Sequence, residues 1–437
     1  MSTLQEKNLQ CNSAISVSND GGQLSTDAGM VLVQEFLNKI NFKQLLTKTV
    51  HLHDRRKYCT HNLYDLFIQL LLQIIAGYKA DSAANTLRHD PVLTTLLEKE
   101  VLASQPTLSR FLQSLTEERI QEIQTCAQIL GDRCLIHRNQ QELVIDVDST
   151  HCDTFGKQEN TTYNAHYGTN GFHPLIAFDG LTGLFLGAQL RPGNVYTSTG
   201  VAAFVRPLIE RYRHYSCGMT LLLRGDSGFA TPQLYELCEE TQTKFVIRLK
   251  ASQTLKQLGE HQVLYGDETD FTCSEIQYYE IDYRAGSWQD DYRVIAKCTR
   301  AAGELFFRYE FLVTNLREIP MNAVYDIYQK RGTMENDIKE IKHGFFFDKT
   351  DSSSFRVNSA RMMISCLAYN LIHTMKQVTF TKEQQKNTIA TVRFKLFHLA
   401  GRVTKHARKT RIQLASTNVF DSLFWQVLSA IQCLRAP

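Results

Sequence analysis

The sequence predicts an α/β protein, in which a mixed sheet flanked by helices is joined at both ends to mainly helical regions. Residues 142–150 form a short apolar run rich in β-branched side chains, which is typical of a buried strand. Residues 200–250 alternate helical and strand patterns, and this alternation predicts helices packed on a sheet. Residues 252–312 return to strand texture, which predicts a further β-rich region.

The N-terminal region is predicted to be helical. Residues 30–40 and 63–76 carry apolar side chains at helical spacing. Thr107 precedes an apolar-periodic stretch that reaches Leu115, so we expect Thr107 to cap a helix there. The whole of residues 1–140 is therefore interpreted as one helical region.

The rest of the chain divides by changes of pattern. Predicted strands cover residues 142–150, 173–178, 184–190, 220–225 and 244–250, with helices at 200–213 and 231–240. Further strands are expected at residues 271–281, 292–297 and 305–313, and helices return near Ala323. The resulting division is 141–251 (first part of the α/β core), 252–312 (β-rich insertion), 313–378 (second part of the core) and 379–437 (basic helical region).

The composition is that of a globular protein. The 437 residues are 43% hydrophobic and 21% charged, with a net charge of +3. The 11 cysteines form no Cys-x-x-Cys pair, which indicates free thiols in a reducing compartment. The longest apolar run, residues 66–76, contains Gln69 and Gln73 and is too short and polar to span a bilayer. We expect a cytoplasmic protein without a membrane partner.

Two aspartates stand at the ends of predicted strands. Asp148 ends the first strand, and Asp226 follows the apolar strand at 220–225. Open sheets bind ligands outside their strand ends, where a carboxylate is placed to hold a cation. An ordinary turn aspartate is an equally good interpretation of either residue alone. Asp146 points to the same face as Asp148 in a regular strand, so spacing does not separate these two.

A third carboxylate lies on a predicted helix at residues 324–343. At about 100° per residue, Tyr328, Arg331, Glu335 and Lys342 fall within an arc of about 60°. Such a stripe suits phosphate chemistry, because arginine can fork onto a phosphate and lysine supplies a point charge. A salt-bridged surface helix is the alternative interpretation of the same charges.

The spacing of this stripe carries a family resemblance. Tyr328, Arg331, Glu335 and Lys342, separated by two, three and six residues, match the Tyr-Arg-Glu-Lys signature of one group of bacterial insertion-sequence transposases. These transposases belong to the DDE class, which is built on an RNase H-like fold. Further segments resemble the same group and spread the resemblance over most of the chain: residues 24–29, 87–91, 105–111, 173–175, 190–194 and 224–229.

The resemblance implies a role for each matched residue. Asp148, Asp226 and Glu335 resemble the three catalytic carboxylates, which hold two Mg²⁺ ions, with Mn²⁺ as a substitute. Tyr328, Arg331 and Lys342 resemble residues that contact DNA phosphates near the cleaved strand. The region before Glu335 resembles an insertion whose tryptophan stabilises a flipped base in relatives, which points to Trp288. Asp146 is then left as a supporting group.

The expected partner is double-stranded DNA. The resemblance implies cut-and-paste transposition: cleavage at terminal inverted repeats, joining of 3′-hydroxyl ends to target DNA, and a homodimer around paired ends in the bacterial cytoplasm or nucleoid. An RNase H-like nuclease without strand transfer and a catalytically silent DNA-binding repressor remain alternatives. Basic side chains outside the stripe are candidates for DNA contact: Arg55, Arg56, Lys57, Arg110, Lys395, Arg402, Lys405, Arg408, Lys409 and Arg411.

Overall fold

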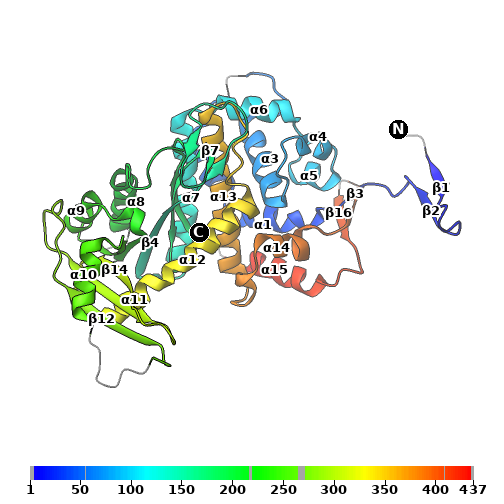
Figure 1. Ribbon diagram of the computed structural model, residues 1–437. Helices are drawn as coiled ribbons and strands as arrows, with labels where there is room; N and C mark the ends of the chain where they lie inside the picture. Colours follow the sequence, from blue (N-terminus) through cyan, green and yellow to red (C-terminus); the bar gives the residue numbers. More distant parts are fainter. Residues whose placement is uncertain (1–3, 55, 216–218, 264–270, 408, 435–437) are drawn as a thin grey trace. The chain divides into compact units, whose positions relative to one another are not determined.

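The computed structural model describes residues 4–54, 56–215, 219–263, 271–407 and 409–434 (Figure 1). The chain divides into two compact units that interleave along the sequence. Unit 1 consists of Met1–Cys126, His343–Phe346 and Leu367–Pro437, and unit 2 consists of Ala127–Lys342 and Phe347–Cys366. Two long helices, α7 (Glu117–His137) and α13 (Phe355–Thr379), have residues in both units.

Unit 2 is built on an eight-stranded mixed sheet with the order β12-β13-β14-β11-β10-β4-β8-β9. Strands β4, β10 and β11 run parallel to one another, and the strands outside them pair antiparallel. The strands are β4 (Glu142–Ser149), β8 (Leu175–Asp179), β9 (Phe185–Gln189), β10 (Thr220–Gly225), β11 (Lys244–Leu249), β12 (Glu275–Ile281), β13 (Arg293–Arg300) and β14 (Arg308–Thr314).

Helices cover both faces of this sheet (Figure 1). The side chains of Leu143, Ile145 and Val147 alternate onto one face, where they join a core formed with α8 (Val201–Tyr215), α9 (Pro232–Glu240) and α10 (Gln253–Gln262). The opposite face packs against α11 (Met321–Gln329) through Val324 and Tyr325. Because side chains alternate along β4, Asp146 and Asp148 lie on the face that α11 covers.

A small three-stranded sheet stands beside the main one in unit 2. Its order is β5-β7-β6, with β5 at Cys152–Asp153, β6 at Thr162–Asn164 and β7 at Thr169–Phe172. The chain enters it directly after β4 and returns from it into β8.

Unit 1 contains the N-terminal helices and the end of the chain. Its helices include α1 (Val31–Lys39), α2 (Phe42–Thr49), α3 (Leu63–Ala76), α4 (Ala83–Leu87), α5 (Pro91–Leu96), α6 (Gln105–Ser114), α14 (Ile389–Val392) and α15 (Asp421–Cys433). Its strands are β1 (Glu6–Asn8), β2 (Ser16–Ser18), β3 (Leu24–Ser25), β15 (Gly401–His406) and β16 (Lys409–Leu414). The helix expected at residues 63–76 is confirmed, and an Asn62–Asp65 capping box fixes its start.

The expected mixed α/β class is confirmed, but two sequence expectations are wrong. The last region is not wholly helical, because β15 and β16 form a hairpin that pairs with β3. Thr107 does not cap α6, which begins after Ser104, so Thr107 lies inside its first turn. The strands expected within the insertion, β12 to β14, are present and pair with the main sheet through β14 and β11.

The helix expected over residues 324–343 is interrupted twice. A 3₁₀ turn at Lys330–Gly332 separates α11 from α12 (Thr333–Lys339), and a π-helical turn follows at Glu340–Gly344. Each change of helical repeat rotates the residues beyond it relative to a regular α-helix. The uniform 100° step therefore fails between Tyr328 and Lys342.

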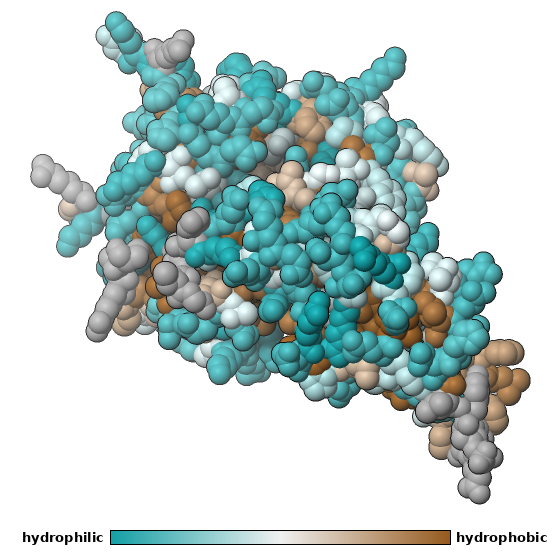
Figure 2. Space-filling model, turned by 90° about the vertical axis from the view of Figure 1, so that its left-hand side faces the viewer, coloured by the Kyte–Doolittle hydropathy of each residue, from teal (hydrophilic) through white to brown (hydrophobic). Residues whose placement is uncertain are grey.

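No helix within the described residues is long and apolar enough to cross a membrane. The face of the molecule shown in Figure 2 is mostly hydrophilic, and its hydrophobic side chains lie in separate patches.

Candidate functional site

Asp148 and Asp226 lie at the carboxyl ends of two neighbouring strands in the main sheet. Because β4 and β10 are parallel neighbours, their carboxyl ends lie side by side. The Oδ1 atom of Asp148 accepts a hydrogen bond from the Ser149 amide at 2.8 Å. The Oδ1 atom of Asp226 accepts one from the Gly228 amide at 2.8 Å. These local bonds engage one oxygen of each carboxylate.

Arg331 is the cation nearest to Asp148. Its Nη2 atom lies 2.9 Å from Oδ2 of Asp148 and donates to the Val147 carbonyl at 3.1 Å. Only 12% of the Arg331 side chain is exposed. Burial alone lowers the pKa of a guanidinium, but the carboxylates of Asp148 and Asp226 together hold the pKa of Arg331 above its usual range. Arg331 is therefore within electrostatic reach of both aspartates.

The charge state of Asp148 reflects competing influences. Burial raises the pKa of its carboxyl group, the charge of Arg331 opposes that rise, and the nearby Asp226 adds to it. Two neighbouring carboxylates form a site of concentrated negative potential, which favours a bound cation. Their oxygen atoms are the ligands that Mg²⁺ and Mn²⁺ prefer.

Lys342 and Tyr328 also lie close to this edge. The Lys342 ammonium donates to the His151 carbonyl at 2.8 Å and to the Thr150 hydroxyl at 3.3 Å, in the segment that follows Asp148. Burial raises the pKa of Tyr328, and the charges of Arg331 and Asp226 act on its hydroxyl. Three residues of the predicted stripe are thus gathered around the two aspartates.

Glu335 is not gathered with them. It lies in the first turn of α12 with an exposed side chain, and it has no ion pair or hydrogen bond to any residue in the described ranges. Over the same ranges, no three His, Cys, Asp or Glu side chains come together as a metal site. Glu335 stands four residues beyond Arg331, after the 3₁₀ turn at Lys330–Gly332.

Asp146 has a different environment from Asp148. It is fully buried and forms a double ion pair with Arg224, in which Nε donates to Oδ1 and Nη2 to Oδ2, each at 2.6 Å. Arg224 also donates from Nη1 to the carbonyl of Ile327, next to Tyr328, at 2.6 Å. We name Asp146, Arg224 and the Ile327 carbonyl the clamp. Both oxygens of Asp146 are committed to it, which favours Asp148 as the metal-facing aspartate.

Sequence reasoning missed Arg224, although a signal was present. Arg224 interrupts an apolar strand directly before Gly-Asp, and a buried arginine needs a carboxylate partner. Only the register of the sheet, in which Arg224 stands opposite Asp146, identifies that partner.

Trp288 is enclosed by aromatic side chains in this structure. Only 7% of it is exposed, and its ring makes edge contacts with Tyr235, Tyr283 and Tyr292. The role in base flipping that the resemblance implies for Trp288 stays a prediction. We assign it to the core of unit 2.

Replacing Trp288 by alanine is expected to destabilise the protein by about 3–5 kcal/mol, because the substitution leaves a large cavity in that core. Urea unfolding of the Trp288→Ala protein measures the loss. Trp425 is 52% exposed, so Trp425→Ala is a matched control with an expected change of roughly 0.5 kcal/mol. Unchanged stability of Trp288→Ala would contradict the core assignment.

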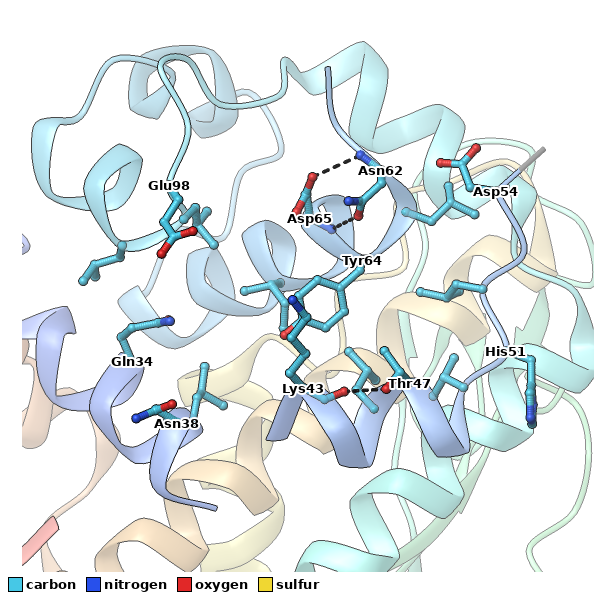
Figure 3. A pocket seen from close by; sticks show the side chains of 18 of the residues that line it. Gln34, Asn38, Lys43, Thr47, His51, Asp54, Asn62, Tyr64, Asp65 and Glu98 are labelled. Atoms are coloured by element: carbon cyan, nitrogen blue, oxygen red, sulfur yellow. Dashed lines mark hydrogen bonds between the residues drawn. The ribbon is translucent and has the colours of Figure 1, made fainter. Parts of the chain in front are cut away.

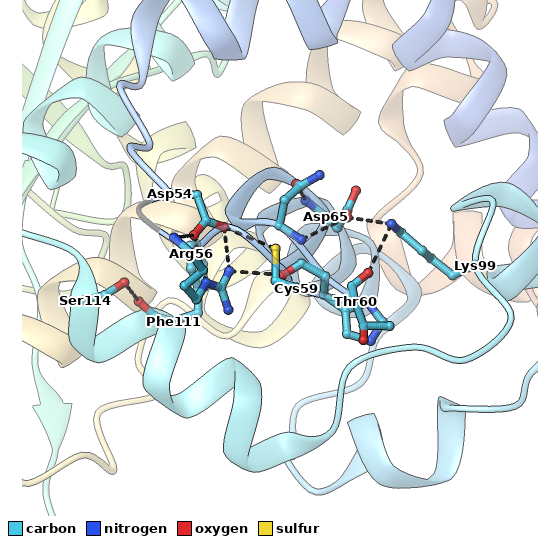
Figure 4. Close-up of polar contacts among 10 residues, drawn as sticks. Asp54, Arg56, Cys59, Thr60, Asp65, Lys99, Phe111 and Ser114 are labelled. Atoms are coloured by element: carbon cyan, nitrogen blue, oxygen red, sulfur yellow. Dashed lines mark hydrogen bonds and ion pairs between the residues drawn. The ribbon is translucent and has the colours of Figure 1, made fainter.

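The basic candidates of unit 1 have mixed surroundings. Arg110 is exposed on α6, where its guanidinium donates to the Thr107 hydroxyl at 3.3 Å. Arg56 is held by Asp54 and also donates to the His61 carbonyl (Figure 4). Arg110 is therefore the more accessible of these two cations for a phosphate. Arg55 and Arg408 lie outside the described residues.

A separate pocket of about 660 Å³ lies in unit 1 between α1, α2 and the start of α3 (Figure 3). Polar side chains line it, including Gln34, Asn38 and Lys43, and the Lys43 ammonium lies over the Tyr64 ring. It contains none of the predicted catalytic residues. It is therefore distinct from the site at the ends of β4 and β10.

The family described as Transposase DDE domain group 1 matches residues 7–436. A solved structure of the piggyBac transposase synaptic complex with hairpin DNA is 10% identical, with 84% of this chain and 80% of that chain covered and a TM-score of 0.45. The Mos1 transposase paired-end complex is 12% identical, with 47% and 64% covered and a TM-score of 0.18. No curated protein matches the chain.

Proposed function

The chain belongs to the DDE transposases, and from that premise we propose that it carries out cut-and-paste transposition of a bacterial insertion sequence. It cuts DNA at the terminal inverted repeats of its own element and joins the freed 3′-hydroxyl ends to target DNA. The observation that carries this proposal is the meeting of Asp148, Asp226 and Arg331 at adjacent strand ends.

The proposed core is RNase H-like. Its strands would be β9, β8, β4, β10 and β11, in that order in the sheet. Strands β4, β8 and β9 form an antiparallel meander, and β10 and β11 then run parallel to β4. Strands β12 to β14 and α10 then represent the insertion before Glu335, placed at the sheet edge beyond β11. The Tyr-Arg-Glu-Lys spacing supports the assignment to the group that carries this signature.

In the proposed site, Asp148, Asp226 and Glu335 hold two Mg²⁺ ions, for which Mn²⁺ can substitute. Bound ions would lower the pKa of the attacking hydroxyl and stabilise the leaving oxygen. The oxygen-only donor set of Asp148 and Asp226 fits these cations. Glu335 joins the site by a rearrangement of α12, for which the neighbouring 3₁₀ and π turns supply two points of adjustment.

Basic side chains orient the DNA in this proposal. Arg331 presents a planar fork and Lys342 a point charge beside Asp148, and both suit a phosphate flanking the cleaved bond. Tyr328 supplies a hydroxyl from α11, which ends just before the 3₁₀ turn that carries Arg331. Arg110 contacts the DNA backbone farther from the cleaved bond, and a homodimer holds the two ends together.

The test is incubation of the purified full chain with duplexes that carry its own terminal repeats, with Mg²⁺, with Mn²⁺ and with EDTA. We expect strand-specific cleavage that requires the metal, followed by joining of labelled 3′ ends to a target plasmid. Cleavage without joining would identify a nuclease instead. Repeat-specific binding without cleavage in either metal would identify a silent DNA-binding repressor.

A further inference from the structure

The turn between β6 and β7 carries a tyrosine whose ring is held by histidines. Tyr167 stacks on His151 with ring centroids 4.7 Å apart and an interplanar angle of 21°. The ring of His166 meets it edge-on at 4.8 Å, and that of His173 at 6.1 Å. One aromatic ring is thus positioned by three others, although it lies in a turn.

The supports of this ring are themselves fixed. His151 is 7% exposed, and its Nε2 atom lies 2.9 Å from the Thr169 hydroxyl and 3.2 Å from Oδ1 of Asp153. His173 is 6% exposed, and its Nδ1 atom lies 2.9 Å from the Val195 carbonyl. Because both histidines are buried and hydrogen-bonded, the ring of Tyr167 is preorganised.

The turn itself is also held in place. Oδ1 of the buried Asn164 accepts hydrogen bonds from the amides of His166 and Tyr167, at 3.0 and 3.3 Å. The Asn164 side chain donates in turn to the Gly193 carbonyl at 2.7 Å. Gly171 completes the arrangement, because a Cβ atom there would collide with the His151 ring.

This ring lies next to the carboxylate site. His151 follows Asp148 by three residues, and its carbonyl is the acceptor for Lys342. Burial raises the pKa of the Tyr167 hydroxyl, and the charges of Asp148 and Asp226 raise it further. The tyrosine therefore lies within electrostatic reach of both aspartates and stays neutral at physiological pH.

Tyr167 is nevertheless 43% exposed, and its hydroxyl has no hydrogen-bond partner in the part of the chain that the structure describes. Core packing alone does not require a rigidly supported ring that remains open to solvent beside a charged site. Such a ring is suited to stacking, because every base has a π-face and an aromatic platform accepts it without regard to sequence.

We propose that Tyr167 is a DNA-binding residue whose ring stacks on a base adjacent to the phosphate that is cleaved. This inference rests on the proposed function, because it takes the ligand to be a DNA end at Asp148 and Asp226. The stack fixes the strand next to the carboxylates, while Arg331 and Lys342 contact the phosphates. No property of the hydroxyl group is needed, so the ring alone carries the interaction.

The test compares Tyr167→Ala and Tyr167→Phe with the wild-type chain on terminal-repeat DNA that carries 2-aminopurine beside the cleavage site. Loss of the ring is expected to weaken binding of the DNA end roughly tenfold, which corresponds to about 1.4 kcal/mol. The stacking-dependent fluorescence quenching is expected to disappear in Tyr167→Ala and to persist in Tyr167→Phe. Tyr163 in β6 is 59% exposed, so Tyr163→Ala is the matched control, with unchanged binding and fluorescence.

The outcomes separate this inference from the proposed function. Absence of metal-dependent cleavage by the wild-type chain would overturn the proposed function and this inference with it. If the wild type cleaves while Tyr167→Ala keeps its affinity and its quenching, only the role of Tyr167 is refuted. Equal losses in Tyr167→Phe and Tyr167→Ala would also refute stacking. Thermal melting of each variant shows whether a loss of binding comes from a loss of folding.

Discussion

Asp148→Asn is expected to lower the rate of DNA cleavage by at least ~10³-fold, with Asp226→Asn giving a loss of the same order. The reason is that charge stabilisation by bound metal ions is worth several kcal/mol, and each ~1.4 kcal/mol changes a rate tenfold. The two variants are expected to differ in stability, because Arg331 forms an ion pair with Asp148 and not with Asp226 among the described residues. Single-turnover cleavage of terminal-repeat DNA and thermal unfolding measure the two effects.

Asp326→Asn is the matched control for these carboxylates. Asp326 is an exposed acidic residue on α11, and neither Asp148 nor Asp226 is among the groups that it touches. Its neutralisation is expected to leave cleavage unchanged. Cleavage at the wild-type rate by folded Asp148→Asn or Asp226→Asn protein would contradict the proposed site.

Substitutions in the clamp are expected to affect the stability of the protein and its rate of DNA cleavage separately. Arg224→Met leaves Asp146 buried without its partner, which is expected to cost about 3–5 kcal/mol of unfolding free energy. The double variant Asp146→Leu/Arg224→Met replaces the pair with apolar groups and is expected to regain most of that stability. The double variant does not restore the hydrogen bond to the Ile327 carbonyl, so Tyr328 and Arg331 are expected to be misplaced. Its rate of DNA cleavage is therefore expected to stay roughly 10²-fold below that of the wild type.

Urea unfolding and single-turnover cleavage of the single and double variants distinguish these effects. Gly180→Ala offers an independent perturbation, because its Cβ atom would collide with both Arg224 and Asp146. Gly286→Ala, where an added Cβ meets nothing within 4 Å, is the control. Wild-type cleavage by the double variant would show that the clamp has no positioning role.

Local patterns were sufficient for most of the core elements. Strand β10 lies where the apolar run 220–225 predicted it, and α3 coincides with the periodic stretch 63–76. Both segments are apolar enough for burial to reinforce their intrinsic preference. The strand-end positions of Asp148 and Asp226 follow from the same patterns, whereas the pairing of their two strands does not.

Other features depended on contacts between distant segments. The hairpin of β15 and β16 lies in a basic region with few local strand signals, and its pairing with β3 links residues almost four hundred positions apart. The ring of Trp288 packs against Tyr283 and Tyr292 of its own loop and against Tyr235 of α9, and the contact with α9 is not visible in its own segment. The breaks at Lys330–Gly332 and Glu340–Gly344 each end at a glycine, but a single glycine does not determine whether a turn is 3₁₀ or π-helical.

The sequence by itself determined the α/β class, the strand-end positions of two aspartates and the spacing of Tyr328, Arg331, Glu335 and Lys342. These features depend on the short-range spacing of residues along helices and strands, which is regular wherever one face of an element is buried. Only the tertiary structure decided which aspartate pairs with Arg224, which faces Arg331, and that Glu335 remains turned away. Those outcomes depend on sheet register and helix packing, which bring together charges that are far apart along the chain.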